Sequence, residues 1–87
     1  MSIQAIVERD LEMLARCDAI IVLTGDRPSW GTAWEACVAH YLGLVLVAVG
    51  ADKDGWLGYH ADAVVETVRD ACREVADILV LRECKQE

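Results

Sequence analysis

Two apolar runs decide the fold: AIIVLT at 19–24 and LVLVAV at 44–49, separated by GDRPSWGTAWEACVAHYLG at 25–43. Each run is short, continuous and rich in β-branched residues, which is typical of a strand covered on both faces. Between them, Gly25 and Pro28 break the first strand, and the pattern predicts a helix over 33–42. Gly43 stands where a left-handed residue commonly ends a helix. A strand, a helix and a second strand in this order predict two parallel strands of an α/β sheet.

The sequence on either side adds a helix before this unit and a strand and a helix after it. Ser2 is a candidate N-cap for the first helix. That helix has an apolar stripe made of Ile3, Ile6, Val7, Leu11 and Leu14. After a Gly/Asp-rich loop at 50–60, DAVVE at 62–66 predicts a short third strand. Thr67, with Asp70 three residues later, starts a last helix in the manner of a capping box.

The last helix has a predicted apolar stripe made of Val68, Cys72, Val75, Ala76 and Leu79. The full order is therefore α-β-α-β-β-α. We expect an α/β fold of the Rossmann-like (flavodoxin-like) kind, in which three layers surround a small parallel sheet reduced to about three strands. At 87 residues the chain forms a single domain over 1–87. One edge of so small a sheet is expected to be unfinished and covered by another subunit.

Composition narrows the class of partner. Fifteen acidic and eight basic side chains give a net charge of −7, which argues against general binding to nucleic acid or to an anionic membrane. The longest apolar run, at 42–49, is too short to span a bilayer. The N-terminal MSIQAIVERD has no apolar core of a signal peptide, so a cytoplasmic location is expected.

The four cysteines, at 17, 37, 72 and 84, form no C-x-x-C pair. Neither His40 nor His60 stands at zinc-finger spacing from them. We expect reduced, mostly buried thiols, with no metal site and no cofactor.

The candidate binding site follows the first strand. In α/β sheets ligands bind at the carboxyl ends of the strands, and there GDRPSWGT runs into a helix N-terminus. Gly31 allows close approach to the backbone, Ser29 offers a hydroxyl, and free N–H groups after Thr32 suit an anion such as phosphate. The other interpretation is an ordinary strand-to-helix loop closed by a Ser/Thr cap.

Two carboxylates also have two interpretations each. Thr32-x-x-Glu35 matches a capping box, in which Glu35 folds back onto the backbone of Thr32. Glu35 is also well placed as a nucleophile, since a helix N-terminus favours its ionised form. Asp10 is either a solvated residue of the first helix or a group tilted toward the edge of the sheet.

These residues resemble the nucleoside 2-deoxyribosyltransferase superfamily, and most closely its 2′-deoxynucleoside 5′-phosphate N-hydrolase branch. The resemblance rests on Glu8-Arg9-Asp10-Leu11, on Asp18 before the first strand, and on Pro28-Ser29-Trp30-Gly31 followed by Glu35. It covers about residues 8–50, and the motifs come in the family's order. The chain departs from the family in two places: it lacks the N-terminal strand and its Gly-rich loop, and the loop at 50–60 contains no serine.

The resemblance implies cleavage or transfer of an N-glycosidic bond of a nucleoside or nucleoside 5′-monophosphate. By position, Glu35 matches the nucleophile that attacks the sugar, Asp10 the acid/base that assists the leaving base, and Ser29 the phosphate-binding serine. Trp30, Gly31 and Thr32 complete the expected substrate-binding turn. Such chemistry needs a carboxylate at the oxocarbenium-like centre and an acid for the departing base.

Two other functions remain open from the sequence. One is a catalytically inactive nucleotide-binding or regulatory module, and the other is a structural protein in which Glu35 only caps a helix. Under all three we expect a homodimer or larger homo-oligomer, and under the enzyme and the binding module we also expect a small-molecule nucleoside or nucleotide as ligand. Trp30, Trp34 and Trp56 near the predicted mouth suggest buried contacts, either with another subunit or within a local cluster.

Overall fold

The computed structural model describes residues 2–25, 30–52 and 55–85. Its elements follow in the order α1 (Ile3–Ala15), β1 (Ala19–Leu23), α2 (Trp30–Tyr41), β2 (Val45–Val49), α3 (Trp56–His60), β3 (Ala63–Val65) and α4 (Val68–Lys85). The strands form one sheet in the order β1-β2-β3, and both neighbouring pairs are parallel. The predicted mixed α/β fold with a small three-stranded parallel sheet is confirmed.

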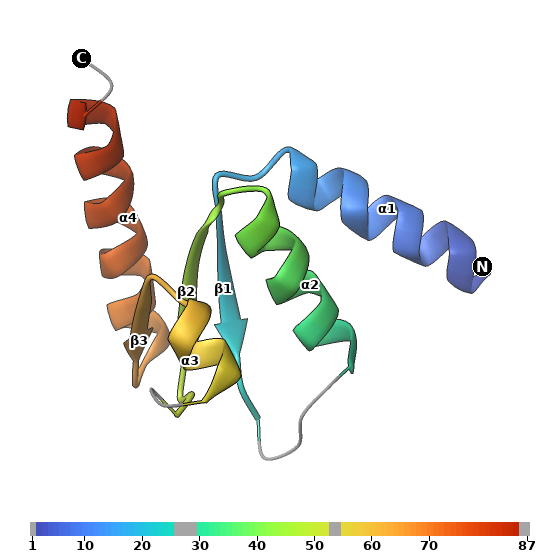
Figure 1. Ribbon diagram of the computed structural model, residues 1–87, viewed down its shortest axis with the longest axis horizontal. Coiled ribbons are helices and arrows are strands. Elements are labelled where there is room, and N and C mark those ends of the chain that lie inside the picture. Colours follow the sequence, from blue (N-terminus) through green and yellow to red (C-terminus); the bar gives the residue numbers. More distant parts are fainter. Residues whose placement is uncertain (1, 26–29, 53–54, 86–87) are drawn as a thin grey trace.

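Helices cover the sheet on both sides, which gives the three layers (Figure 1). Alternation along β2 directs Leu46 to one face and Val47 to the other. On the first face, Leu46 packs with Val22 of β1 and Ala36 of α2. On the second face, Val47 packs with Val45 and with Ala71 of α4. The two cores meet at β2, which is therefore the most buried element of the fold.

The end of α2 has the form that the sequence predicts. The amide of Gly43 donates to the carbonyl of His40, and the amide of Leu44 donates to the carbonyl of Ala39. This pair of bonds is a Schellman motif, which needs a left-handed residue at Gly43. Gly43 has φ of +76°, and the chain passes directly from this turn into β2.

The start of α2 differs from the prediction. The helix begins at Trp30, so Thr32 lies in its first turn and is not the N-cap. Gly31, expected to be a loop residue, is also helical. The Thr32-x-x-Glu35 capping box is therefore a wrong interpretation of this helix start.

The loop after β2 contains a helix that the sequence analysis missed. The stretch at 50–60 was expected to be a loop, but its second half forms α3. Leu57 explains why, because it packs against the core made by Val22, Ala36 and Leu46. A single turn of helix brings Leu57 inward and leaves its neighbour Trp56 outside.

The helix caps follow the prediction at two other places. The Ser2 hydroxyl accepts a hydrogen bond of 3.1 Å from the amide of Ala5 at the start of α1. The Thr67 hydroxyl accepts one of 3.1 Å from the amide of Asp70 at the start of α4.

The predicted apolar stripe of α4 is corrected by the packing. The side chains that reach the sheet are Ala71, Val75, Ile78 and Leu79. Val68, Cys72 and Ala76 are exposed instead.

The expectation that the cysteine thiols are mostly buried is also wrong. The four cysteines are all free and exposed: Cys17, Cys37, Cys72 and Cys84.

Candidate functional site

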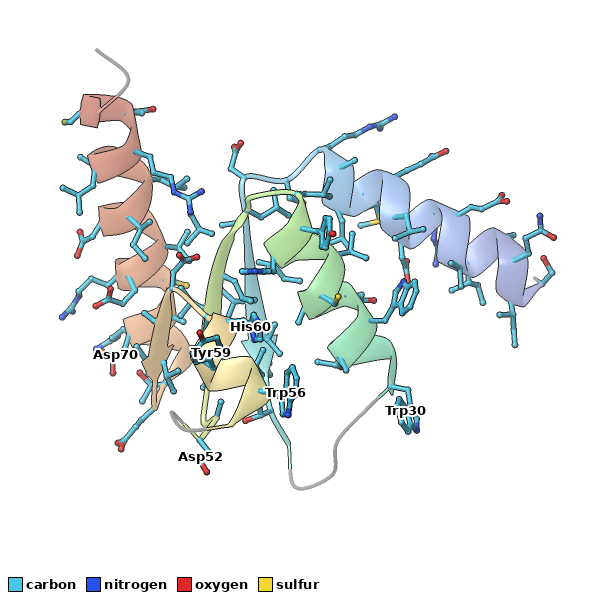
Figure 2. All side chains as sticks on the ribbon, in the orientation of Figure 1. Trp30, Asp52, Trp56, Tyr59, His60 and Asp70 are labelled. Carbon is cyan, nitrogen blue, oxygen red and sulfur yellow. The ribbon has the colours of Figure 1, made fainter. Side chains whose placement is uncertain are left out.

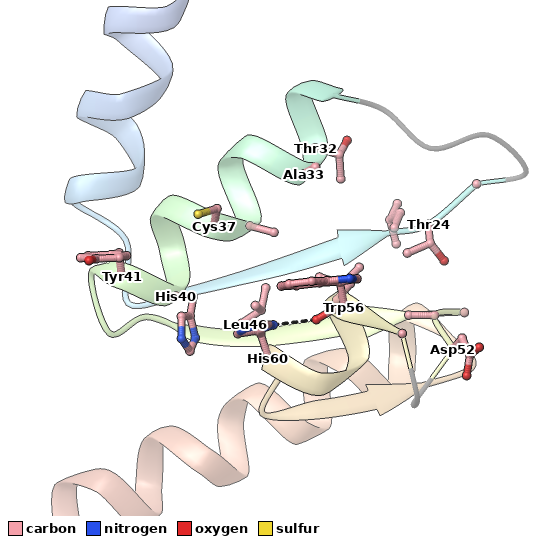
Figure 3. A pocket seen from close by; sticks show the side chains of 17 residues that line it. Thr24, Thr32, Ala33, Cys37, His40, Tyr41, Leu46, Asp52, Trp56 and His60 are labelled. Carbon is pink, nitrogen blue, oxygen red and sulfur yellow. Dashed lines mark hydrogen bonds between the residues drawn. The ribbon is translucent and has the colours of Figure 1, made fainter.

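A pocket of about 940 Å³ opens at the carboxyl ends of β1 and β2 (Figure 3). The strand ends contribute Leu23, Thr24 and Gly25 on one side and Gly50, Ala51 and Asp52 on the other. The walls come from α2 and α3, and Leu46 of β2 contributes from the sheet. This is the position at which parallel α/β sheets bind ligands, and the volume lies in the range of ligand pockets.

The two strand ends are fixed to each other. The Thr24 hydroxyl donates a hydrogen bond of 2.7 Å to the carbonyl of Val49, and the Thr24 amide donates to the same oxygen at 3.2 Å. Gly50 follows with φ of +80°, and its amide donates to the carbonyl of Val65 at 2.8 Å. A Cβ at Gly50 would lie 3.2 Å from the Thr24 hydroxyl oxygen. The backbone at the ends of β1 and β2, where the pocket opens, is therefore tightly held.

Aromatic rings gather around His60 of α3. The His40 ring, from α2, meets the His60 ring edge-on with centroids 5.0 Å apart. Tyr59 also meets it edge-on at 5.0 Å, and Trp56 stacks on it at 6.0 Å with 9° between the planes. Figure 2 shows Trp56, Tyr59 and His60 together on the short helix α3. The pocket wall thus presents flat π surfaces drawn from two helices.

The orientation of the His60 ring is set by the backbone. Its Nδ1 lies 2.7 Å from the carbonyl oxygen of Trp56. A carbonyl only accepts, so Nδ1 carries the hydrogen, and Nε2 of the neutral ring is left as an acceptor. The Trp56 carbonyl therefore favours this tautomer of the neutral His60 ring.

The pocket has two chemically different ends. In Figure 3, His40 and Tyr41 lie toward the C-terminal end of α2, whereas Thr24, Thr32 and Asp52 lie toward the carboxyl ends of the strands. The first end is lined by rings, Trp56 lies between the two ends, and the second end carries hydroxyl and carboxylate groups beside the apolar Leu23 and Ala51. A ligand with one flat ring and one polar group matches this division.

Only part of the substrate-binding turn predicted from the sequence lies at the pocket. Thr32 lines the pocket. Trp30 and Gly31 are exposed residues of the first turn of α2 and are not among the described lining residues. Ser29 lies outside the described residues.

The two predicted catalytic carboxylates lie elsewhere. Glu35 and Asp10 are both half-buried, on α2 and α1 respectively, and neither is among the described residues of the pocket wall. Ala33 and Cys37 line the pocket from two positions before and two after Glu35. At about 100° per residue, Glu35 therefore projects from the opposite face of α2. Asp10 therefore lies on α1 and Glu35 on the face of α2 away from the pocket, and these two helices contact each other.

Sequence reasoning missed the aromatic side of the pocket. From the sequence, His40 is interpreted only as a candidate metal ligand and Trp56 only as a residue at a subunit contact or in a local cluster. The useful signal was the placement of Trp56 and His60 four residues apart, which is the spacing of neighbours on a helix. In the described part of the chain, no group of three or more His, Cys, Asp or Glu side chains is arranged to hold a metal ion.

Comparisons with protein-family models, with curated proteins and with solved structures find no match to this chain. Within the described ranges, no helix has the length and apolar character that a membrane crossing requires. The site must therefore be interpreted from its own geometry.

Proposed function

We propose that the protein binds a nucleoside or nucleoside 5′-monophosphate in the pocket at the carboxyl ends of β1 and β2. The observation that carries the proposal is the division of one pocket into a ring-lined end and a hydroxyl-lined end. A nucleoside has the same division, with a flat base at one end and a sugar, with or without phosphate, at the other. The resemblance of residues 8–50 to nucleotide-processing enzymes points to the same ligand class.

The base would occupy the aromatic end. The Trp56 indole is largely exposed, yet it lines the pocket, so one of its faces can stack on a ligand ring. Stacking of a nucleobase on an aromatic side chain contributes about 1–3 kcal/mol. His60 Nε2 adds an acceptor for an exocyclic amino group of the base.

The sugar and phosphate would occupy the hydroxyl-lined end. The Thr24 hydroxyl has its hydrogen committed to Val49 but still offers an acceptor lone pair. Asp52 supplies a carboxylate that suits sugar hydroxyl groups. The N-terminus of α2, with Thr32 in its first turn, provides the partial positive charge that favours a phosphate.

Calorimetry with a panel of nucleosides and nucleoside 5′-monophosphates tests this function. Wild-type protein is expected to bind at least one member, and Trp56→Ala is expected to weaken that binding about 5- to 150-fold, from the loss of 1–3 kcal/mol of stacking. Trp34→Ala is the matched control, because Trp34 is another exposed tryptophan but lies outside the described pocket wall. Absence of binding across the panel, or equal losses in the two variants, would overturn the proposal.

A second candidate function is cleavage or transfer of an N-glycosidic bond, with Glu35 as nucleophile and Asp10 as acid/base. One observation favours it: both carboxylates are half-buried, and they stand on two helices that contact each other. This chemistry would take place on the α1 side of α2, across that helix from the pocket.

The two functions can be separated because they use opposite faces of α2. Release of free base from deoxynucleoside monophosphates, followed by chromatography, measures the second function. Glu35→Gln keeps the shape of the side chain and removes the nucleophile, so it is expected to abolish release and leave binding in the Trp56 pocket intact. No release by the wild type, or equal release by Glu35→Gln, would exclude the catalytic role of Glu35.

We also propose that the protein works in the cytoplasm as a homodimer or larger homo-oligomer, with this small molecule and not nucleic acid as its ligand. The net charge of −7 opposes binding to a polyanion. Four free, exposed cysteines suit a reducing compartment. Large apolar side chains on several elements are exposed, which favours association of subunits.

A further inference from the structure

The first helix projects away from the sheet instead of packing on it (Figure 1). Its apolar row is Ile3, Val7, Leu11 and Leu14, at the spacing of one helix face. Only the C-terminal end of the row is covered: the exposed fraction is 80% at Ile3 and 43% at Val7, but 8% at Leu14. The helix α1 therefore meets the rest of the chain at one end and presents the remainder of its apolar face to solvent.

A second apolar row runs along α2. Trp30, Trp34, Val38 and Leu42 follow at intervals of four residues, a spacing that places side chains along one side of a helix. None of the four is among the described residues of the pocket wall. Trp30 and Trp34 are 94% and 62% exposed, and the exposure falls to half-buried at Val38, as it does along α1 toward Leu14. The two rows lie on helices that contact each other, and we refer to them together as the α1–α2 surface.

The α1–α2 surface is free of charge along both rows. None of their eight side chains is ionisable, although the chain as a whole carries a net charge of −7. Charged residues of α1 such as Glu8, Arg9 and Glu12 stand outside the row. Asp10 and Glu35 border the rows, since Asp10 stands three residues from Val7 and Glu35 three residues from Val38, but both are half-buried, so the larger part of the exposed surface is apolar. Its tryptophans are of the residue type enriched at interface centres.

The exposed area agrees with what a dimer needs. Five exposed side chains of the two rows contribute: Ile3, Val7, Trp30, Trp34 and Leu42. A fully exposed aliphatic side chain presents roughly 100 Å² and a tryptophan roughly 200 Å², so the exposed fractions leave about 500 Å² of apolar area. Homodimer interfaces are about 65% apolar, which corresponds to about 750 Å² per copy, and a stable dimer buries about 800 Å² per copy.

We infer that a second copy of this chain covers the α1–α2 surface, with α1 of each copy packed against α1 and α2 of the other around a two-fold axis. A two-fold contact uses the same surface on both subunits, so one apolar patch satisfies both. The inference names the surface of the proposed homo-oligomer and is independent of the pocket and its ligand. The pocket is lined by the other side of α2, so it remains open in the dimer.

Sedimentation equilibrium from micromolar to submillimolar concentration tests the inference. The wild type is expected to be a dimer, and Val7→Glu is expected to raise the dimer dissociation constant at least about tenfold, since a carboxylate would be buried without a partner. Val80→Glu is the matched control, because Val80 is also an exposed valine on a helix, 57% accessible, but it lies on α4, outside the α1–α2 surface. This control is expected to remain dimeric.

A second variant separates loss of the interface from loss of folding. Ile3→Glu places an acidic side chain at the first position of α1, where it favours the helix of the monomer. It is therefore expected to stay folded by circular dichroism and still to dissociate. A monomeric wild type, a dimeric Val7→Glu, or dissociation by Val80→Glu would each overturn the inference. Nucleotide binding is expected to be equal in all three variants, so failure of this interface would not be confused with failure of the pocket.

Discussion

The strands β1 and β2 are nearly the same in sequence character and very different in surroundings. Both have five residues, both are continuously apolar, and they pair in register from Ala19 with Val45 to Leu23 with Val49. Four of the five residues of β2 are buried, whereas β1 buries only Val22 and leaves Leu23 61% exposed. Position in the sheet, and not strand composition, produces this difference.

The same contrast separates the two sides of the molecule. Beside β2, the long helix α4 packs along the sheet and buries Ala71 completely. Beside β1, helix α1 turns away from the sheet (Figure 1). The β2–α4 side is therefore a finished core, while the β1–α1 side exposes a strand edge and a helix face. The β2–α4 side should therefore contribute most of the stability of the isolated chain. The β1–α1 side should contribute the surface through which two chains associate.

The largest effect should come from shortening matched leucines in the two strands. Leu46→Ala removes a side chain that is 1% exposed, at the centre of the core with Val22 and Ala36, and is expected to lower the free energy of unfolding by about 2–5 kcal/mol. Leu23→Ala, at the exposed end of β1, is expected to cost less than about 1 kcal/mol. Chemical denaturation of both variants measures the difference, and equal losses would show that β1 is as well covered as β2.

Local signals in the sequence were sufficient for most of the fold. Continuous apolar runs identified β1 and β2, Gly43 identified the end of α2, and Ser2 and Thr67 identified two helix starts. Each of these features depends on a few adjacent residues. The errors arose where distant packing decided the outcome: Leu57 reaches the core from α3, and the sheet selects Ala71 and Ile78 as the contact face of α4.

The candidate site was less predictable for the same reason. The sequence pointed to the end of the sheet at which the pocket lies, and of the residues it named there Thr32 lines the pocket. It could not bring His40 and His60 together, because they lie on different helices, twenty residues apart. It also could not show that Glu35 projects from the other face of α2, since that depends on which side of the helix meets the pocket.

A smaller effect is expected at the junction of the strand ends. Gly50→Ala introduces a Cβ at φ of +80° and 3.2 Å from the Thr24 hydroxyl oxygen, so it is expected to cost about 1–2 kcal/mol. Gly25→Ala is the control, because a Cβ there would meet nothing within 4 Å. It is expected to change stability by less than about 0.5 kcal/mol. Thermal unfolding of both proteins measures the comparison, and a neutral Gly50→Ala would show that the ends of β1 and β2 are not tightly held.

The smallest effect on global stability, and the most informative about the two sides, should come from matched helix caps. Ser2 and Thr67 each accept a hydrogen bond of 3.1 Å from an amide three residues later. Loss of such a cap destabilises its helix by roughly 0.5–2 kcal/mol. Thr67→Ala is expected to lower the free energy of global unfolding by about 1 kcal/mol, because α4 forms one face of the core.

Ser2→Ala should destabilise α1 by a similar amount locally and yet leave the global free energy of unfolding almost unchanged. The N-terminal half of α1 is in contact with little else in the monomer, so it can unfold without opening the core. Hydrogen exchange at low protein concentration should therefore show faster exchange confined to the first turns of α1, with the amides of β2 unaffected. If Ser2→Ala lowers global stability as much as Thr67→Ala, α1 belongs to the cooperative core. At concentrations at which the dimer forms, the same substitution should instead weaken association, since the helix it loosens supplies the interface.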